Sequence, residues 1–438
     1  MGESLVLYGM RFECLSSEFF SGNRSRLMEA MPEGAMALLH SNDVMPTSAD
    51  GVMPFVQDSD MIYLSGIDQE ETVLLLYPSA PDPKQREILF VRRTDEHLAI
   101  WEGEKFTKEA ATLRSGVQNV QWTENFDGLF GQLVVQADEV LLNSNEHARA
   151  ACGVETRAMR LNRECQAKYP LHRYGRLAPL LHVLRAVKQE EEVQAIRRAC
   201  AITEAGFRRV LGMMAPGVGE WEVEAEYTHE FLKSGSRGHA YSPIVGGGKN
   251  ACVLHYVSNH ERLQAGDLVL MDVGAECSHW NADMTRTVPV SGKYTERQAE
   301  VYNAVLEVMR YAASIVKPGV MPKEYTQLVL EKVQQALIGL GLIDAAEAAD
   351  QDDSKPLVRR YFMHGVSHHL GLDVHDVAPS NEAFAEGHVI TIEPGIYIRE
   401  ENIGIRIENN YRITADGVED LMATIPVEIE EIERLMAR

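Results

Sequence analysis

The sequence predicts a two-domain α/β protein whose second domain consists of two related halves. Its 438 residues are too many for one ordinary hydrophobic core, so we expect two domains. The first part of the chain alternates short apolar runs with helical segments, and the second part repeats one order of helices, glycines and strands. We place the two domains at residues 1–175 and 176–438.

The first domain carries short apolar runs with the composition of buried strands in an α/β sheet. These runs are Gly34–His40, Thr72–Tyr77, Glu87–Val91 and Glu139–Leu142. Helices are expected at Phe20–Met31 and Lys108–Leu113. This part has no cluster of residue types that carry catalysis, so we expect a non-catalytic α/β domain.

The second domain repeats a pair of helices separated by a Pro-Gly turn. A helix is expected to begin near Gln189, because three glutamates follow it and acids favour helix N-termini. It ends at Pro216-Gly217, and a second helix covers Glu220–Lys233. The same order returns around Pro318-Gly319, between helices expected at 296–316 and 323–339. A glycine- and histidine-bearing segment follows each pair, at 244–255 and at 364–375, which indicates a duplicated half-domain.

Each half then contains an apolar strand that ends in an acid. In 266–274 and 387–395, a carboxylate stands six residues after a glycine and two before another, giving Asp272 and Glu393. Further acids follow at Asp283 and Glu408. A buried acid is costly unless a charged or hydrogen-bonding group pairs with it. Four inward-facing acids beside a histidine-rich segment therefore indicate a metal site rather than a hydrophobic core.

The charge of this cluster matches two divalent cations. Four ionised carboxylates carry four negative charges, which two such ions balance. Oxygen-rich ligation with one imidazole favours Mn²⁺, and many such sites tolerate Co²⁺ or Zn²⁺. Two metals that share carboxylates acidify a water between them and present it as hydroxide to a polarised carbonyl, which is the chemistry of hydrolysis.

Composition excludes several classes of partner. A formal net charge of −23 disfavours nucleic acid and anionic membrane surfaces, both of which attract Lys and Arg. The six cysteines have no CxxC spacing, so reduced thiols are expected. No stretch approaches the roughly 20 apolar residues of a spanning helix, and no secretion signal is evident, so a cytoplasmic protein is expected.

Gly246–Lys249 lacks the spacing of a phosphate-binding loop and is expected to form a turn.

Several motifs of the second domain resemble the pita-bread (creatinase/aminopeptidase-like) dinuclear metallopeptidases, and most closely aminopeptidase P. They are Met271–Glu276, Asn281–Val290, His364–Asp376, Ile392–Tyr397 and Gly404–Glu408. In the first domain, Ile62–Ile67 and Ile100–Gly103 resemble the non-catalytic domain of the same family. The resemblance spans nearly the whole chain. It implies an N-terminal α/β domain followed by a pseudo-symmetric pita-bread α+β catalytic domain.

The resemblance assigns the metal ligands residue by residue. It implies that Asp272 and Asp283 ligate one metal ion. His368 and Glu393 would ligate the other ion. Asp283 and Glu408 would bridge the two ions. Because only the second half supplies a histidine ligand, the two ions are expected to differ in affinity.

The resemblance also assigns residues that act on the substrate. His255 and His375 would hydrogen-bond the scissile carbonyl or the tetrahedral intermediate. His364 matches a position behind the ligands or on the proline side, and Arg406 would hydrogen-bond the ligands. Glu393 would also serve as a general base for the attacking water.

Two departures from the family pattern stand near these residues. His369 lies next to His368 where many relatives have an aromatic or apolar residue, and it could compete as the metal-binding ring. The register of the motif favours His368. Asn409-Asn410 replaces a common acidic pair, and neither departure removes a ligand.

The implied activity is hydrolysis of the bond between an N-terminal residue and a following proline, by a metal-bridging hydroxide. The substrates would be peptides with proline at the second position, and the enzyme would form a homo-oligomer, a dimer or tetramer. The nearest alternative is prolidase, which uses the same site on dipeptides. A catalytically dead binding module would have lost ligands, and methionine aminopeptidase would leave the long N-terminal domain unexplained.

Overall fold

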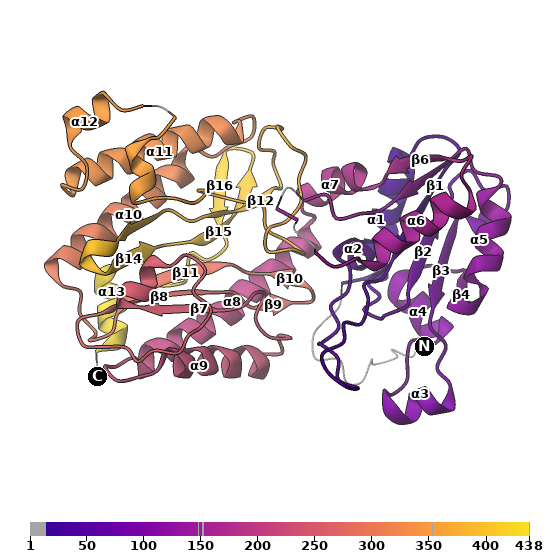
Figure 1. Ribbon diagram of the computed structural model, residues 1–438, viewed down its shortest axis with the longest axis horizontal. Coiled ribbons are helices and arrows are strands. Elements are labelled where there is room, and N and C mark those ends of the chain that lie inside the picture. Colours follow the sequence, from indigo (N-terminus) through magenta and orange to yellow (C-terminus); the bar gives the residue numbers. More distant parts are fainter. Residues whose placement is uncertain (1–14, 148, 151–152, 353, 438) are drawn as a thin grey trace, which may run out of the picture. The chain divides into compact units, whose positions relative to one another are not determined.

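The described part of the chain forms two compact units that divide between Arg185 and Ala186 (Figure 1). The structure is a computed structural model, and it describes residues 15–147, 149–150, 153–352 and 354–437. None of the helices in these ranges has the length and apolar content needed to cross a membrane.

The first unit is built on a six-stranded mixed sheet with the order β4-β3-β2-β1-β5-β6. Its strands are β1 (Ala35–His40), β2 (Val73–Leu76), β3 (Glu87–Val91), β4 (Val120–Trp122), β5 (Glu139–Leu142) and β6 (Arg173–Arg176). The four predicted apolar runs are the four inner strands, β1, β2, β3 and β5. The two edge strands, β4 and β6, were not predicted, because edge strands do not need two apolar faces.

Five of the seven helices described in this unit begin with a side chain that caps the first turn. They are α1 (Ser17–Ala30), α2 (Ser59–Ser65), α3 (Glu96–Trp101), α4 (Lys108–Ser115), α5 (Phe126–Val134), α6 (Arg157–Lys168) and α7 (Ala178–Ala186). Helix α1 begins before the predicted Phe20, because the Ser16 hydroxyl accepts the amide hydrogen of Phe19 and caps the first turn. Phe130 of α5 and Leu161 of α6 pack with strand residues Met36 and Phe90 in one buried cluster.

The second unit pairs its helices as the duplicated sequence predicts. Its helices are α8 (Glu190–Met213), α9 (Glu220–Lys233), α10 (Glu296–Ile315), α11 (Pro322–Gly339), α12 (Ala345–Ala349) and α13 (Ile429–Met436). Helix α8 packs on α9 and α10 packs on α11. Figure 1 shows the strands of this unit between these two helix pairs. Helix α8 starts with a capping box, in which Glu192 accepts the backbone amide hydrogen of Gln189.

The strands of this unit form two three-stranded sheets and two hairpins. They are β7 (Ile244–Gly247), β8 (Leu268–Val273), β9 (Glu276–Cys277), β10 (Trp280–Asn281), β11 (Met284–Pro289), β12 (Val389–Ile392), β13 (Gly395–Ile398), β14 (Ile403–Arg406), β15 (Asn409–Thr414) and β16 (Gly417–Asp420). The sheets have the orders β11-β8-β7 and β12-β15-β16, and the hairpins are β9-β10 and β13-β14.

The acid strands β8 and β12 begin in the same way in both halves. Gly266 and Gly387 precede them with φ of +90° and +87°, a left-handed conformation that glycine adopts without strain. Strand β8 pairs with β7, and β12 makes the corresponding antiparallel bridge between Ile390 and His369. The predicted pseudo-symmetric fold is confirmed at the level of these turns and pairings.

Candidate metal centre

The predicted ligands lie where strands of the two halves meet. Asp272 is in β8, directly opposite Thr285 of β11, and Asp283 immediately precedes β11. Because alternate residues of a strand share a face, Asp283 and Thr285 point to the same side of the sheet. Thr285 also bridges to Glu408, which lies between β14 and β15. This bridge between strands of the two halves brings acids from both halves together.

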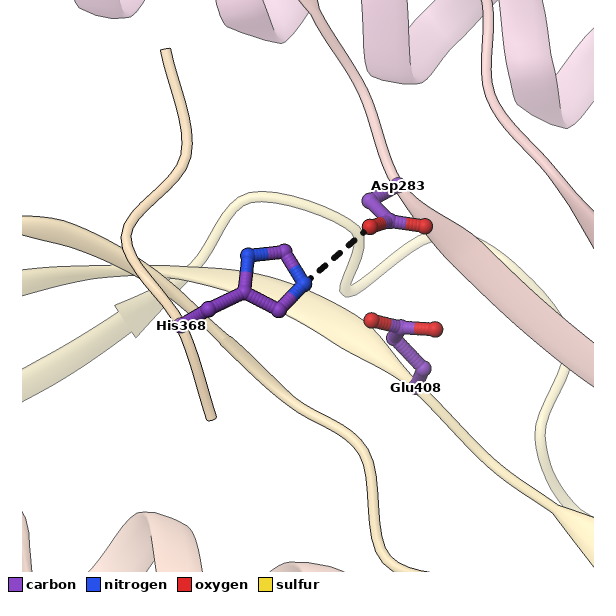
Figure 2. Close-up of side chains that lie close together, drawn as sticks. All are labelled: Asp283, His368 and Glu408. Atoms are coloured by element: carbon purple, nitrogen blue, oxygen red, sulfur yellow. Dashed lines mark ion pairs between the residues drawn. The ribbon is translucent and has the colours of Figure 1, made fainter. Parts of the chain in front are cut away.

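Asp283, His368 and Glu408 form the centre of the cluster (Figure 2). Each offers one atom that can ligate a metal ion, and these atoms lie within 4.8 Å of one another. The Nε2 atom of His368 is 3.4 Å from Oδ2 of Asp283. The Nδ1 atom of His368 lies 2.9 Å from the carbonyl oxygen of His369, an acceptor, so Nδ1 carries the hydrogen. Nε2 therefore faces the acids, so that its lone pair can bind a metal ion once the ion displaces the proton on this nitrogen.

The other two predicted ligands flank this trio. The Tyr241 hydroxyl lies 2.6 Å from Oδ1 of Asp272 and 2.5 Å from Oδ1 of Asp283, so it links the two aspartates. The Oε1 atom of Glu393 is 3.7 Å from Nε2 of His368. All five predicted ligands thus belong to one cluster, in which Asp283 and Glu408 are buried and the other three are half-buried.

Arg406 holds the acids from one side. Its guanidinium donates to Oδ2 of Asp272 at 2.5 Å, to Oγ1 of Thr285 at 3.0 Å and to the Tyr397 hydroxyl at 2.8 Å. The Thr285 hydroxyl in turn donates to Oε2 of Glu408 at 2.7 Å. One fixed cation therefore orients acids from both halves, but one positive charge cannot balance four carboxylates.

The electrostatics of the cluster fit bound cations. Burial, with the neighbouring acids adding to it, raises the pKa of Glu408 well above its usual range. Burial also raises the pKa of Glu393 to about 7. Burial alone would lower the pKa of His368, but its hydrogen bond to Asp283 and the charge of Glu393 outweigh that effect and raise it to about 9. Without cations the cluster therefore retains protons, which divalent ions displace when they bind.

Two of the predicted substrate-side histidines lie against this cluster. The His375 ring stacks on His368, with 4.1 Å between ring centroids and 29° between planes. The Nδ1 atom of His364 is 3.5 Å from Oε2 of Glu393, and its Nε2 is 2.8 Å from the Tyr397 hydroxyl. Both rings are half-buried and adjoin the predicted ligands.

His255 is exposed, three residues after the short helix η3 (Gly248–Cys252). Within the described ranges, no hydrogen bond or ion pair joins it to the five predicted ligands. It is close enough to His364 that its charge contributes to lowering the pKa of that ring, after the larger effect of burial. The competing ring of His369 points elsewhere, since it packs edge-on against His388 at 4.8 Å.

Sequence reasoning missed several residues that support the ligands. Tyr241 lies in the segment before β7, outside any motif, and only its place in the fold links it to Asp272. Asn410, one of the two asparagines that depart from the family pattern, grips the backbone of Asp283. Its side chain accepts the amide hydrogen of Asp283 at 3.0 Å and donates to the Asp283 carbonyl at 2.6 Å.

Comparisons with known proteins agree with this arrangement. Residues 194–415 match the model of metallopeptidase family M24, and residues 20–142 match that of the aminopeptidase P N-terminal domain. The chain is 35% identical to the Xaa-Pro aminopeptidase of Escherichia coli (strain K12), over 96% of this chain and 98% of that protein.

Solved structures match over the same length. The structure of E. coli aminopeptidase P with the inhibitor Pro-Leu superposes with a TM-score of 0.86 at 34% identity, covering 97% of this chain and 99% of that one. The Zn-substituted E. coli enzyme in complex with product gives the same TM-score, identity and coverage. The predicted fold class and the predicted family are both confirmed: this chain belongs to metallopeptidase family M24, in its aminopeptidase P group.

Proposed function

We propose that this chain is an Xaa-Pro aminopeptidase, which hydrolyses the bond between an N-terminal residue and a following proline. The observation that carries the proposal is that Asp272, Asp283, His368, Glu393 and Glu408 lie together in one cluster. Relatives that match both units from end to end are named for this activity. The complete cluster also argues against a catalytically dead binding module on this fold.

We propose that the cluster binds two divalent cations, with Mn²⁺ the preferred ion and Co²⁺ or Zn²⁺ accepted. Asp272 and Asp283 would hold one ion, and His368 and Glu393 the other, with Asp283 and Glu408 shared. The solved E. coli relative with substituted zinc supports a divalent ion in this family. When bound, such ions acidify the attacking water and polarise the scissile carbonyl.

Glu393 is the residue best suited to take the proton of the attacking water. Its carboxylate lies between two imidazoles, 3.7 Å from His368 and 3.5 Å from His364. A general base must lie within hydrogen-bond reach of the proton that it takes, and Glu393 belongs to the cluster that would hold the attacking water.

The histidines around the cluster would bind the reacting peptide. His375, stacked on His368, would donate a hydrogen bond to the carbonyl oxygen as negative charge develops there. Proline's tertiary amide has no N–H, so the enzyme must recognise the ring by shape. His364, whose Nε2 lies 2.8 Å from the hydroxyl of the buried Tyr397, would present its ring beside Glu393 to contact the proline.

The assay that tests the activity compares an Xaa-Pro-Xaa tripeptide with an Xaa-Pro dipeptide, with Mn²⁺ added to purified protein. We expect release of the N-terminal residue from the tripeptide. Cleavage of the dipeptide alone would instead identify a prolidase. No cleavage of either, with no divalent ion bound, would support a binding module.

We further propose that the protein is a cytoplasmic homo-oligomer, a dimer or tetramer. Analytical ultracentrifugation measures the assembly directly, and a monomer at all concentrations would contradict it. Fractionation of cells that express the protein tests its location.

A further inference from the structure

A fully buried ion pair lies beside the metal centre but is not part of it. The Lys188 ammonium is 2.8 Å from Oδ2 of Asp376, and each side chain is 1% exposed. Taking two charges out of water costs several kcal/mol per ion by general estimates, so a buried pair is weak evidence for stability by itself. A pair in this position invites a functional explanation.

The pair fixes the loop that carries His375. Asp376 is the next residue in the chain, so whatever fixes Asp376 also fixes the backbone of His375. The other carboxylate oxygen of Asp376 accepts the amide hydrogen of Val377 at 3.0 Å, and the Asp376 amide donates to the His369 carbonyl at 2.8 Å. The Asp376 side chain therefore links Lys188 to the backbone on either side of it.

The start of the same loop is fixed as closely. A Cβ atom at Gly371 would lie only 3.0 Å from the Lys188 ammonium and closer still to Asp376, so the chain passes directly over the ion pair. On its other side, the Asn281 side chain donates to the carbonyls of Gly371 and Leu372, at 3.1 and 2.8 Å. Both ends of the segment 371–377 are thus fixed to buried groups.

The backbone of Lys188 is also fixed, by a hydrogen bond to another part of the chain. Its amide donates to the Gly387 carbonyl at 2.9 Å. Glu192, a second acid near the ammonium, is occupied by other donors, the Trp280 ring N–H at 3.2 Å and the Gln189 amide at 2.9 Å. Asp376 is the residue whose carboxylate lies against the Lys188 ammonium, at 2.8 Å.

We propose that Lys188 and Asp376 are positioning residues that hold the His375 ring in place over His368. The inference rests on the proposed function, in which His375 contacts the substrate carbonyl. Neither residue of the pair touches the five predicted ligands by a hydrogen bond or ion pair of the described structure. The loop offers two routes from the ion pair to the site: His375 itself, and the His369 carbonyl, which accepts from the Asp376 amide and from Nδ1 of His368. Metal content and the mutant cycle with His375→Ala tell the two routes apart, and we expect the route through His375.

The test separates positioning from stability by removing both charges together. Removing one charge strands the other in the interior and destabilises the protein, whereas a neutral pair of similar shape is often tolerated. We expect the double variant Lys188→Met/Asp376→Asn to have an unfolding temperature within a few degrees of the parent protein's. Its kcat on an Xaa-Pro-Xaa tripeptide should fall roughly 10–100-fold, the range found for residues that orient active-site groups, with little change in KM.

A double-mutant cycle with His375→Ala gives the decisive readout. If the ion pair acts through His375, the same two changes made in His375→Ala should cause almost no further loss of kcat. The proposal would be overturned if the neutral pair lowers kcat by the same factor in the parent and in His375→Ala. An unchanged kcat in the neutral pair variant would also overturn it. Should the neutral pair variant fail to fold, Asp376→Glu keeps the charge, shifts the loop and goes through the same cycle.

Two controls complete the experiment. Glu192→Gln alters the other buried acid near Lys188 while leaving the ion pair intact, so it should keep the parent kcat. Bound Mn²⁺ per chain should be equal in all variants. The ¹⁵N-labelled His375 ring signal should shift or broaden in the neutral pair variant and stay unchanged in Glu192→Gln. This signal tests positioning even if the parent cleaves no Xaa-Pro peptide, a result that would refute the proposed function alone.

Discussion

Removing divalent cations should make this protein progressively less stable as the pH rises from about 5 to 9. The cluster raises the pKa of Glu393 from 4.5 to about 7, chiefly through burial, and raises that of His368 from 6.5 to about 9. A group with a raised pKa binds protons more tightly in the folded chain than in the unfolded one. For each group, stability therefore falls as the pH rises from the pKa of the unfolded chain to the pKa of the folded chain.

For each group, the unfolded and folded pKa values set the sign and size of the change in the free energy of unfolding. The favourable contribution of protonated His368 is complete below pH 6.5 and is lost as the pH rises through 9. The penalty of ionising buried Glu393 grows from pH 4.5 and is complete above about 7. Each shift corresponds to on the order of 3 kcal/mol, and because the two groups interact, their total is smaller than the sum.

The assay is urea unfolding of the metal-stripped protein at pH 5, 7 and 9, beside the Mn²⁺-loaded protein. The loaded protein should gain most over the stripped protein at pH 9, because bound cations replace the lost protons. Glu393→Gln removes one titrating group and should flatten the change between pH 5 and 7 in the stripped protein. Stability that stays level or increases with pH in the stripped parent would refute the reasoning.

Three substitutions test other parts of the account. Glu408→Gln removes a shared ligand and should lower bound metal and reduce kcat more than about 100-fold; metal analysis showing two ions per chain would contradict this. Tyr241→Phe removes the hydroxyl between Asp272 and Asp283 and should weaken metal affinity by about 10–100-fold, measured by calorimetry. Gly274→Ala would overlap a backbone carbonyl oxygen and should cost about 3 kcal/mol or more; an unchanged urea midpoint would count against the strand geometry.

The parts of the fold that follow an apolar pattern could be predicted from the sequence. Strands β1, β2, β3 and β5 are buried on both faces, so their sequences are continuous apolar runs. Strand β6 (Arg173–Arg176) lies at an edge and reads as a basic segment, so its sequence gave no strand signal. The duplication was visible because both halves need a glycine before the acid strand and an acid at its end.

The five residues could be predicted as ligands because acids at the ends of apolar strands are costly and rare. Their supporting residues could not be found in this way. Tyr241 and Asn410 are ordinary polar residues, and only the folded chain brings them to Asp283. Nothing in the sequence around Lys188 indicates burial, yet the structure buries it against Asp376. Contacts between residues far apart in the sequence carry no local pattern.

The most direct test of the account is a titration of metal-stripped protein with Mn²⁺, with tripeptide cleavage and bound metal measured in the same samples. We expect no Xaa-Pro cleavage without metal, two binding steps of different affinity, and full activity at two ions per chain. Full activity of the stripped protein, or two bound ions without cleavage of any Xaa-Pro-Xaa peptide, would contradict the account.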